Sequence, residues 1–193
     1  MVRYIIIISG PAGVGKTTIC DRLVKEFSLH LYRLITATSR QARSNEVDGV
    51  DYIFLSSKDF IQKIGEDEFV EHEMIHGNYY GTLKNSLFES SSDKNLLINI
   101  DVNGAQSIQN IVSNSEAKGF QTLSIFIRPK SIEDLKDRLS NRGTDEEDEI
   151  NRRMETAKQE IAQANSFDFI IDSTNKALDY NLVKNFFVKS VGL

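Results

Sequence analysis

Short apolar runs alternate with segments of helical periodicity along most of the chain. The apolar runs, which predict buried strands, are Tyr4–Ser9, Asn95–Asp101, Gln121–Arg128 and Phe167–Asp172. The amphipathic segments, which predict helices, are Lys16–Phe27, Gly104–Val112, Ser131–Leu139, Asp148–Ala164 and Asn175–Val188. Because strands and helices follow one another in this order, we expect a parallel sheet that helices cover on both faces.

The segment from Thr36 to Thr82 breaks this alternation. It is richer in strand-like, polar and aromatic residues, and a short helical pattern separates the runs Asp51–Leu55 and Phe69–Glu71. We therefore expect an inserted lobe with a small sheet of its own, mixed or antiparallel.

The bulk composition fits one compact domain. A length of 193 residues suits a single core with small insertions. The net charge of −5 argues against non-specific nucleic-acid binding, which needs a basic excess. The apolar run Tyr4–Ile8 is too short for a membrane span, and it enters a glycine-rich loop rather than a signal-peptide cleavage site. We therefore expect a soluble, cytoplasmic protein with neither a nucleic-acid nor a membrane partner.

The glycine-rich loop after the first predicted strand fits a phosphate-binding pattern. Its residues are Gly10, Pro11, Ala12, Gly13, Val14, Gly15, Lys16 and Thr17. Glycines let backbone N–H groups approach phosphate oxygens, and the N-terminus of the next helix favours the same anion. The pattern predicts an ATP site that extends to Thr18, with Lys16 on the β and γ phosphates and the Thr17 hydroxyl on Mg²⁺.

Six further stretches follow in order along the chain: Thr36–Arg43, Glu46–Tyr52, Phe69–Glu71, Gly77–Thr82, Asn99–Ala105 and Arg138–Thr144. With the phosphate loop, they closely resemble the guanylate kinase family, whose members phosphorylate GMP with ATP. The resemblance extends from Ser9 to Ala177, and several ordered motifs are more specific than the phosphate loop alone. It implies a P-loop NTPase fold with three α/β/α layers, a parallel core sheet, a GMP-binding lobe and a helical lid.

The resemblance also implies how a single domain, residues 1–193, is divided. The core would comprise residues 1–35, 83–138 and 154–193, the GMP-binding lobe residues 36–82 and the lid residues 139–153. The sequence leaves open whether the protein is a monomer or a homodimer.

The inserted lobe carries residues that the resemblance assigns to the phosphate of GMP. Arg40 and Arg43 would supply forked cationic donors. Tyr52 and Tyr80 would add phenolic hydroxyls. In isolation, each of these residues would more often be a surface or core residue, so the prediction depends on their joint order beside a phosphate loop.

The resemblance assigns a second group of residues to the guanine base. Guanine presents N1–H and N2–H₂ as adjacent donors, and the Glu71 carboxylate would accept both. Thr36 and Thr82 would donate to O6, and Asp101 would be a second acidic contact. Adenine offers no matching pair of donors, and a buried carboxylate without partners is costly, so we expect strong discrimination.

Arginines in the second half of the chain match those that the family brings over ATP. They are Arg138, Arg142 and Arg153, with Arg152 as the alternative to Arg153. Glu149 is expected to pair with Arg153 four residues later. The acceptor phosphate is already anionic, so we expect no general base. The implied catalytic residues are Lys16, Arg40, Arg138, Arg142 and Arg153.

The chain departs from the family pattern at several positions. Ala42 stands where the family usually has proline. Asn99 stands where it usually has aspartate, near the phosphate-loop lysine and the metal. Asp172 stands roughly where an asparagine often meets adenine.

Three alternative functions remain. A kinase of the same fold could act on a ribose bisphosphate, but that acceptor has no guanine edge for Glu71. The same residue disfavours an AMP or dTMP kinase. A non-catalytic scaffold with a guanylate-kinase-like domain typically lacks the phosphate-loop and lid basic residues, whereas Lys16, Arg138 and Arg142 are present here.

One motif points elsewhere. The residues from His72 to His76 match the H-E-x-x-H zinc-peptidase pattern, which needs both histidines on one face of a helix. A strand-like run precedes them and the turn signal Gly77-Asn78 follows, so we expect no zinc site.

Overall fold

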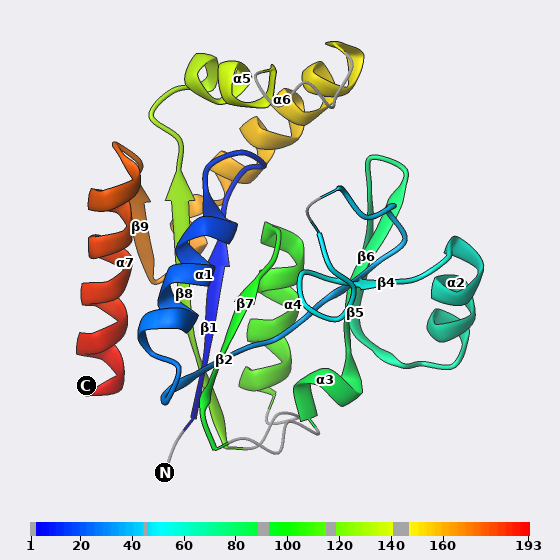
Figure 1. Cartoon of the computed structure of the whole chain (residues 1–193), viewed down its shortest axis with the longest axis horizontal. Helices are drawn as coiled ribbons and strands as arrows, with labels where there is room; N and C mark the ends of the chain where they lie inside the picture. Colours follow the sequence, from blue (N-terminus) through cyan, green and yellow to red (C-terminus); the bar gives the residue numbers. More distant parts are fainter. Residues whose placement is uncertain (1–2, 45, 89–92, 115–118, 141–146) are drawn as a thin grey trace.

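The computed structural model describes residues 3–44, 46–88, 93–114, 119–140 and 147–193. In this part of the chain, a parallel core sheet has the strand order β2-β7-β1-β8-β9 (Figure 1). The bounds are Arg3–Ser9 (β1), Leu31–Arg33 (β2), Asn95–Asn99 (β7), Phe120–Arg128 (β8) and Phe169–Asp172 (β9). The predicted parallel sheet is therefore confirmed.

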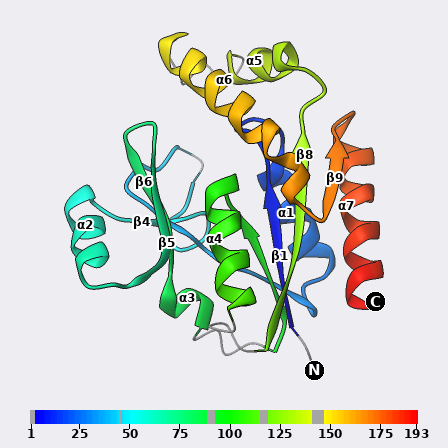
Figure 2. The ribbon, with the colours of Figure 1, turned by 180° about the vertical axis from the view of Figure 1, so that it is seen from behind.

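Helices cover both faces of the core sheet (Figure 1, Figure 2). Along β1, Ile6 and Ile8 pack in one hydrophobic cluster with residues of α1 (Lys16–Glu26) and α7 (Lys176–Val191). The alternate residues Ile5 and Ile7 pack in another cluster with residues of α4 (Val102–Ser113). Because successive side chains of a strand point to opposite faces, the two clusters are the two sides of a three-layer α/β/α core, as predicted.

In the core, two strand ends and one missed strand differ from the sequence prediction. The strand expected to reach Asp101 ends at Asn99, because Asp101 is the N-cap of α4 and its Oδ1 accepts a hydrogen bond from the Gly104 N–H at 2.9 Å. The last strand, expected from Phe167, begins at Phe169, and a short 3₁₀ turn precedes it at Ala164–Ser166. The sequence analysis missed β2, which is too short to show a periodic pattern.

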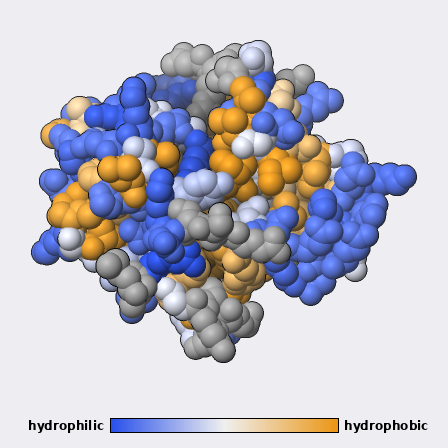
Figure 3. Space-filling view, turned by 60° about the horizontal axis from the view of Figure 1, so that its bottom comes forward, coloured by the Kyte–Doolittle hydropathy of each residue, from blue (hydrophilic) through white to orange (hydrophobic). Residues whose placement is uncertain are grey.

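The inserted lobe has a mixed sheet of its own, in the order β4-β3-β6-β5. Its strands are Ala37–Thr38 (β3), Ile53–Phe54 (β4), Phe69–Ile75 (β5) and Asn78–Leu83 (β6). The β3–β4 pair is parallel and the other pairs are antiparallel. Phe60 of α2 (Ser57–Gly65) is fully buried against this sheet, and α3 (Lys84–Phe88) leads back to the core. Hydrophilic residues cover most of the lobe's outer end, on the right in Figure 3.

A helical pair projects above the carboxyl ends of the core strands (Figure 1). α5 (Ile132–Ser140) packs on α6 (Glu147–Ala162) through a cluster of its own: Leu135, Leu139, Ile150, Met154 and Ala157. The expected start of α5 is confirmed, since the Asp134 N–H donates to Ser131 Oγ at 3.1 Å. The sequence spacing of Thr144 and Glu147 also fits a capping box at the start of α6, but Thr144 lies outside the described residues.

His72 lies within strand β5, so the zinc-peptidase pattern is not on a helix. Among the described residues, no group of histidine, cysteine or acidic side chains is arranged to hold a metal ion. No helix in the described ranges is long and apolar enough to span a lipid bilayer.

Candidate active site

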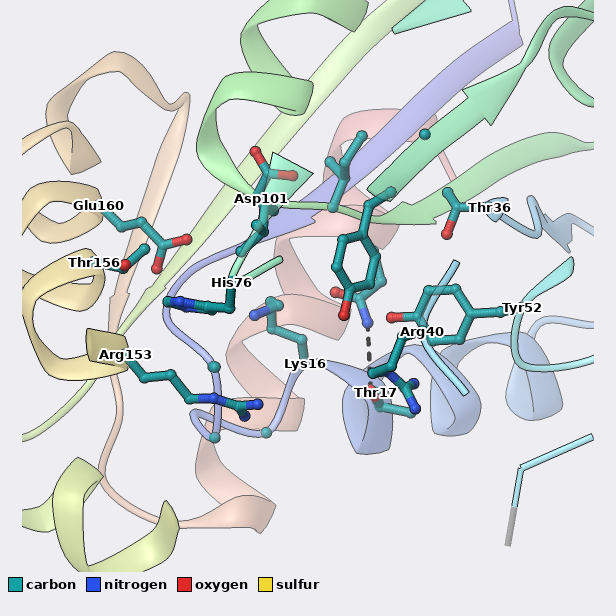
Figure 4. A pocket seen from close by; sticks show the side chains of 18 of the residues that line it. Lys16, Thr17, Thr36, Arg40, Tyr52, His76, Asp101, Arg153, Thr156 and Glu160 are labelled. Carbon is teal, nitrogen blue, oxygen red and sulfur yellow. Dashed lines mark hydrogen bonds between the residues drawn. The ribbon is translucent and has the colours of Figure 1, made fainter. Parts of the chain in front are cut away.

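One cavity of about 270 Å³ lies between the phosphate loop, the inserted lobe and α6 (Figure 4). The predicted site residues that line it are Ala12, Gly13, Gly15, Lys16, Thr17, Thr18, Thr36, Arg40, Arg43, Tyr52, Glu71, Tyr80, Asp101 and Arg153. The described residues that do not line it are Gly10, Pro11, Val14, Thr82 and Arg138. Arg142 lies outside the described residues. The fold therefore brings most of both predicted nucleotide sites to one cavity.

The phosphate loop connects β1 to α1 through backbone conformations that favour glycine. Gly10 has a φ of 133°, and a side chain there would collide with the carbonyl of Ile127. Gly15 is the N-cap of α1 with a φ of 109°. The Lys16 ammonium donates to the carbonyl oxygens of Gly10 and Pro11, the latter at 3.1 Å, so the lysine side chain lies back along the loop. A lysine held there is a positive charge beside the N-terminus of α1, where an anion binds favourably.

The metal-ligating residue predicted for Mg²⁺ also faces the cavity. Thr17 Oγ1 accepts a hydrogen bond from Asn99 Nδ2 at 3.3 Å, at the carboxyl end of β7. The groups that the protein offers to a metal ion here are the Thr17 hydroxyl and the neutral Asn99 amide. Mg²⁺ usually keeps most of its shell as water and substrate phosphate, so this set fits an ion that arrives with a nucleotide.

Arg40 and Arg43 converge on a carboxylate to which the sequence analysis assigned no role. Arg40 Nη2 lies 2.9 Å and Arg43 Nη1 3.3 Å from Glu46 Oε1, and the Arg43 N–H donates to Glu46 Oε2 at 2.8 Å. Although burial disfavours its charged form, the hydrogen bond from Arg40 lowers the pKa of Glu46. Likewise, the bond to Glu46 raises the pKa of Arg40 despite its partial burial. Glu46 therefore fixes both guanidinium groups at the cavity wall.

Two tyrosines stand beside this arginine pair. The Tyr52 and Tyr80 rings lie edge to face at 6.2 Å, and the Arg40 guanidinium lies 5.6 Å from the Tyr52 ring centre. Burial raises the pKa of Tyr52, so its hydroxyl stays protonated at neutral pH. The group as a whole offers cationic and hydroxyl donors to an anion.

Glu71 of β5 also lines the cavity. Its Oε1 accepts a hydrogen bond from Thr82 Oγ1 at 2.6 Å, and Thr82 is fully buried. Burial raises the pKa of the Glu71 carboxyl to about 7, against the effect of this bond, and the nearby Asp101 carboxylate adds to the rise. The bond orients the Glu71 carboxylate, while the predicted contact of Thr82 with guanine O6 stays a prediction.

A glycine on the core side makes room for the Glu71 carboxylate. A side chain at Gly104 would come within 3.2 Å of Glu71 Oε2 and 2.5 Å of Ile100 Cδ1. Because Gly104 is also the residue that Asp101 caps, the start of α4 places Asp101 and the Glu71 carboxylate side by side. Thr36 lines the same cavity from the lobe and is mostly buried.

The structure distinguishes between the two candidate arginines of α6. Arg153 lines the cavity, and its Nε donates to Glu149 Oε1 at 2.9 Å, which confirms the expected pair. Arg152 does not line this cavity, and 66% of its side chain is exposed. Arg138 pairs instead with Asp134 on α5 at 2.9 Å. The geometry therefore favours Arg153 for a contact with a bound nucleotide.

Three polar cavity residues were not assigned to this site from the sequence: His76, Thr156 and Glu160. His76 lies at the β5–β6 turn with a φ of 49°. Thr156 and Glu160 follow Arg153 by three and seven positions on α6, so helical periodicity would have found them once Arg153 was placed at the site. Asp172, considered beside adenine, pairs with Arg128 at 2.5 Å.

Comparisons with known proteins show the family of this chain. The family model described as guanylate kinase matches residues 2–189. The chain belongs to the guanylate kinase family. It is 44% identical to guanylate kinase of Mesomycoplasma hyopneumoniae strain 7448, over 89% of this chain and 87% of that one. It is 43% identical to guanylate kinase of Porphyromonas gingivalis, over 85% of each.

A solved structure of guanylate kinase from Anaplasma phagocytophilum matches 98% of this chain and 86% of that one, with a TM-score of 0.74 and 25% sequence identity. The protein is therefore an enzyme of the guanylate kinase family, with the P-loop kinase fold that the resemblance implied. The inserted lobe and α6, which place Arg40, Glu71 and Arg153 around the cavity, lie within the matched residues.

Proposed function

We propose that this guanylate kinase transfers the γ-phosphoryl group of ATP to the phosphate of GMP, giving ADP and GDP. One observation carries the proposal: a single cavity joins Lys16 and Thr17 of the phosphate loop to the Arg40–Arg43 pair and to the buried Glu71 carboxylate. Family membership favours GMP over the ribose bisphosphate, AMP and dTMP acceptors considered from the sequence. We also propose dGMP as an acceptor.

In this mechanism, an oxygen of the GMP phosphate attacks the γ-phosphorus of ATP in line with the departing β-phosphate oxygen. The attacking oxygen is already anionic, so no side chain needs to remove a proton. Arg40 and Arg43 hold the acceptor, while Lys16 and Arg153 offset the negative charge that spreads over the transferred group. Arg138 and Arg142 remain proposed members of the catalytic set.

Magnesium would be held by the Thr17 hydroxyl together with ATP phosphates, and would supply charge neutralisation there. Asn99 donates to the same hydroxyl and so orients its free lone pair. The remaining loop residues proposed to bind ATP act through backbone N–H groups.

Selection of the base would fall to Glu71, which accepts N1–H and N2–H₂ of guanine at once. The Thr82 hydroxyl orients this carboxylate through its hydrogen bond, and Asp101 and Thr36 complete the proposed base contacts. An adenine would leave the Glu71 carboxylate without donors in a buried position, which is costly.

The division into core, GMP-binding lobe and lid remains a proposal, as does closure of the lobe and lid around both nucleotides. Closure would exclude water and limit wasteful hydrolysis of ATP. We place the enzyme in cytoplasmic purine nucleotide metabolism, where its two substrates are found, as a monomer or homodimer.

A coupled assay of ADP formation tests this function. Purified protein is given ATP and Mg²⁺ with GMP, AMP, dTMP or a ribose bisphosphate in turn. We expect rapid turnover with GMP, at least about 10³-fold above AMP in kcat/KM, because the site pairs with the guanine edge. Turnover that is equal for GMP and AMP, or highest with the ribose bisphosphate, would refute the proposed function.

A further inference from the structure

One face of α6 looks into the cavity. Arg153, Thr156 and Glu160 all line it, and their spacing of three and four residues puts them on one side of the helix. Seven residues of helix separate Arg153 from Glu160 by roughly 10 Å along the axis. Along α6, Glu160 lies nearer to Asp101 than Arg153 does (Figure 4).

The Glu160 carboxylate has no partner of its own in the described part of the chain, where neither a hydrogen bond nor an ion pair holds it. By contrast, two other carboxylates of α6 are paired: Glu149 with Arg152 and Arg153, and Glu155 with Lys158. A carboxylate that faces a cavity without a donor gains most from a ligand that supplies one.

The residues around Glu160 make a hydrogen-bond donor for its carboxylate still more favourable. Burial raises the pKa of its carboxyl to about 7, the charge of Lys16 opposes that rise, and the carboxylates of Asp101 and Glu73 add to it. Asp101 already accepts the Gly104 N–H, and Glu73 accepts from Asn103 Nδ2 at 2.7 Å. Neither acidic neighbour can donate when ionised, so a ligand that brings a donor would relieve the Glu160 carboxylate.

The chemistry of GMP indicates which donor this is. Its phosphate is assigned to Arg40 and Arg43, and the N1–H and N2–H₂ edge of its base to Glu71. The groups left over that donate hydrogen bonds are the two hydroxyls of the ribose. A carboxylate is a common partner for ribose hydroxyls in nucleotide sites.

Resting on the function proposed above, we propose that Glu160 of α6 accepts a hydrogen bond from the ribose 2′-hydroxyl of bound GMP, and that the enzyme thereby prefers GMP to dGMP. Glu160 is then a residue that determines specificity for the sugar, and Glu71 one that determines specificity for the base. The contact joins α6 to the acceptor nucleotide, so both nucleotides would hold the same helix.

Steady-state kinetics with GMP and dGMP at saturating ATP test this proposal on three proteins. They are the wild type, Glu160→Gln, and the matched control Glu155→Gln, which makes the same change on the exposed side of α6. We expect the wild type to favour GMP about tenfold in kcat/KM, as expected at the lower end for a hydrogen bond to a charged group. Glu160→Gln should lose that preference through GMP alone, with dGMP values and the KM for ATP within about twofold of wild type. Glu155→Gln should retain the wild-type ratio.

The outcomes separate this proposal from the proposed function. A wild type that uses GMP and dGMP equally well, or a Glu160→Gln variant that keeps the wild-type ratio, overturns the role of Glu160 and leaves GMP phosphorylation standing. A variant that loses both substrates in equal proportion shows a structural role and also overturns it. A wild type that phosphorylates neither nucleotide overturns the proposed function itself. If the Glu160→Gln protein fails to fold, Glu160→Asp, which keeps the charge but withdraws the carboxylate by one methylene, takes its place, and an unchanged ratio of GMP to dGMP again overturns the role of Glu160.

Discussion

At the scale of single residues, Glu46 and Glu71 show how partners decide the state of a partly buried carboxylate. Glu46 meets two guanidinium groups, and its pKa is lowered although it is largely buried. Glu71 meets one neutral hydroxyl and lies near Asp101, and its pKa rises to about 7. Glu46 therefore serves as a fixed anion that organises Arg40 and Arg43, whereas Glu71 benefits from a ligand with two donors.

The raised pKa of Glu71 predicts that GMP affinity depends on pH. Only the ionised carboxylate can accept both guanine donors, and protonation removes it as pH falls below about 7. Affinity should therefore be highest above pH 7 and weaken by up to about tenfold for each unit below it. Isothermal titration of GMP without ATP, from pH 5.5 to 8.5, measures this dependence.

The Glu71→Gln variant is the control for that titration. It should bind GMP weakly at every pH. Any pH dependence that remains in the variant comes from ionisation of the GMP phosphate or of other groups in the site. If the wild type and the variant show the same change in affinity over this range, the Glu71 carboxylate does not titrate as described.

At the scale of elements, the sequence predicted the segments whose structure depends on neighbouring residues in the chain. The phosphate loop was predictable because its turn between a buried strand and a helix uses positive φ values at Gly10 and Gly15, which favour glycine. The inserted lobe was predictable because its composition departs from the alternation around it. β2 was not predictable, since three residues gain their strand pairing from β7 rather than from a pattern of their own.

The same limit applies to the site. Lys16, Arg40 and Glu71 sit in motifs, and the cavity contains them all. Glu46 and Glu160 were missed because their roles depend on which side chains the fold brings opposite them. The sequence also could not show that Arg138 pairs with Asp134 along α5 rather than lining the cavity.

The face of α6 yields a prediction that separates two adjacent arginines. Arg153→Ala should lower kcat about a hundredfold, because it removes a cation from the cavity in which we propose that the phosphoryl group is transferred. Arg152→Ala is the matched control, and it should stay within about twofold of wild type because its side chain is mostly exposed. Steady-state assays with ATP and GMP measure both, and equal losses in the two variants would contradict the assignment.

At the scale of the whole molecule, the active site belongs to no single part. The core sheet supplies the phosphate loop and Asn99, the inserted lobe supplies Arg40, Arg43 and Glu71, and α6 supplies Arg153. The lobe and the helical pair each have a hydrophobic cluster of their own, and they also touch the core cluster through Val70 of β5 and Ile161 of α6. Such an arrangement suits an enzyme that must admit two nucleotides and then bring them together.

The most direct test of this account is the affinity for a ligand in which adenosine and guanosine are joined through five phosphates. If one cavity holds both substrates in line, this molecule occupies the phosphate loop, the arginine pair and the Glu71 pocket at once. Calorimetry should give a Kd at least about a hundredfold below that of ATP or GMP alone, and Glu71→Gln should remove most of the gain. A Kd no lower than that of ATP would contradict the central claim that both nucleotides share this cavity.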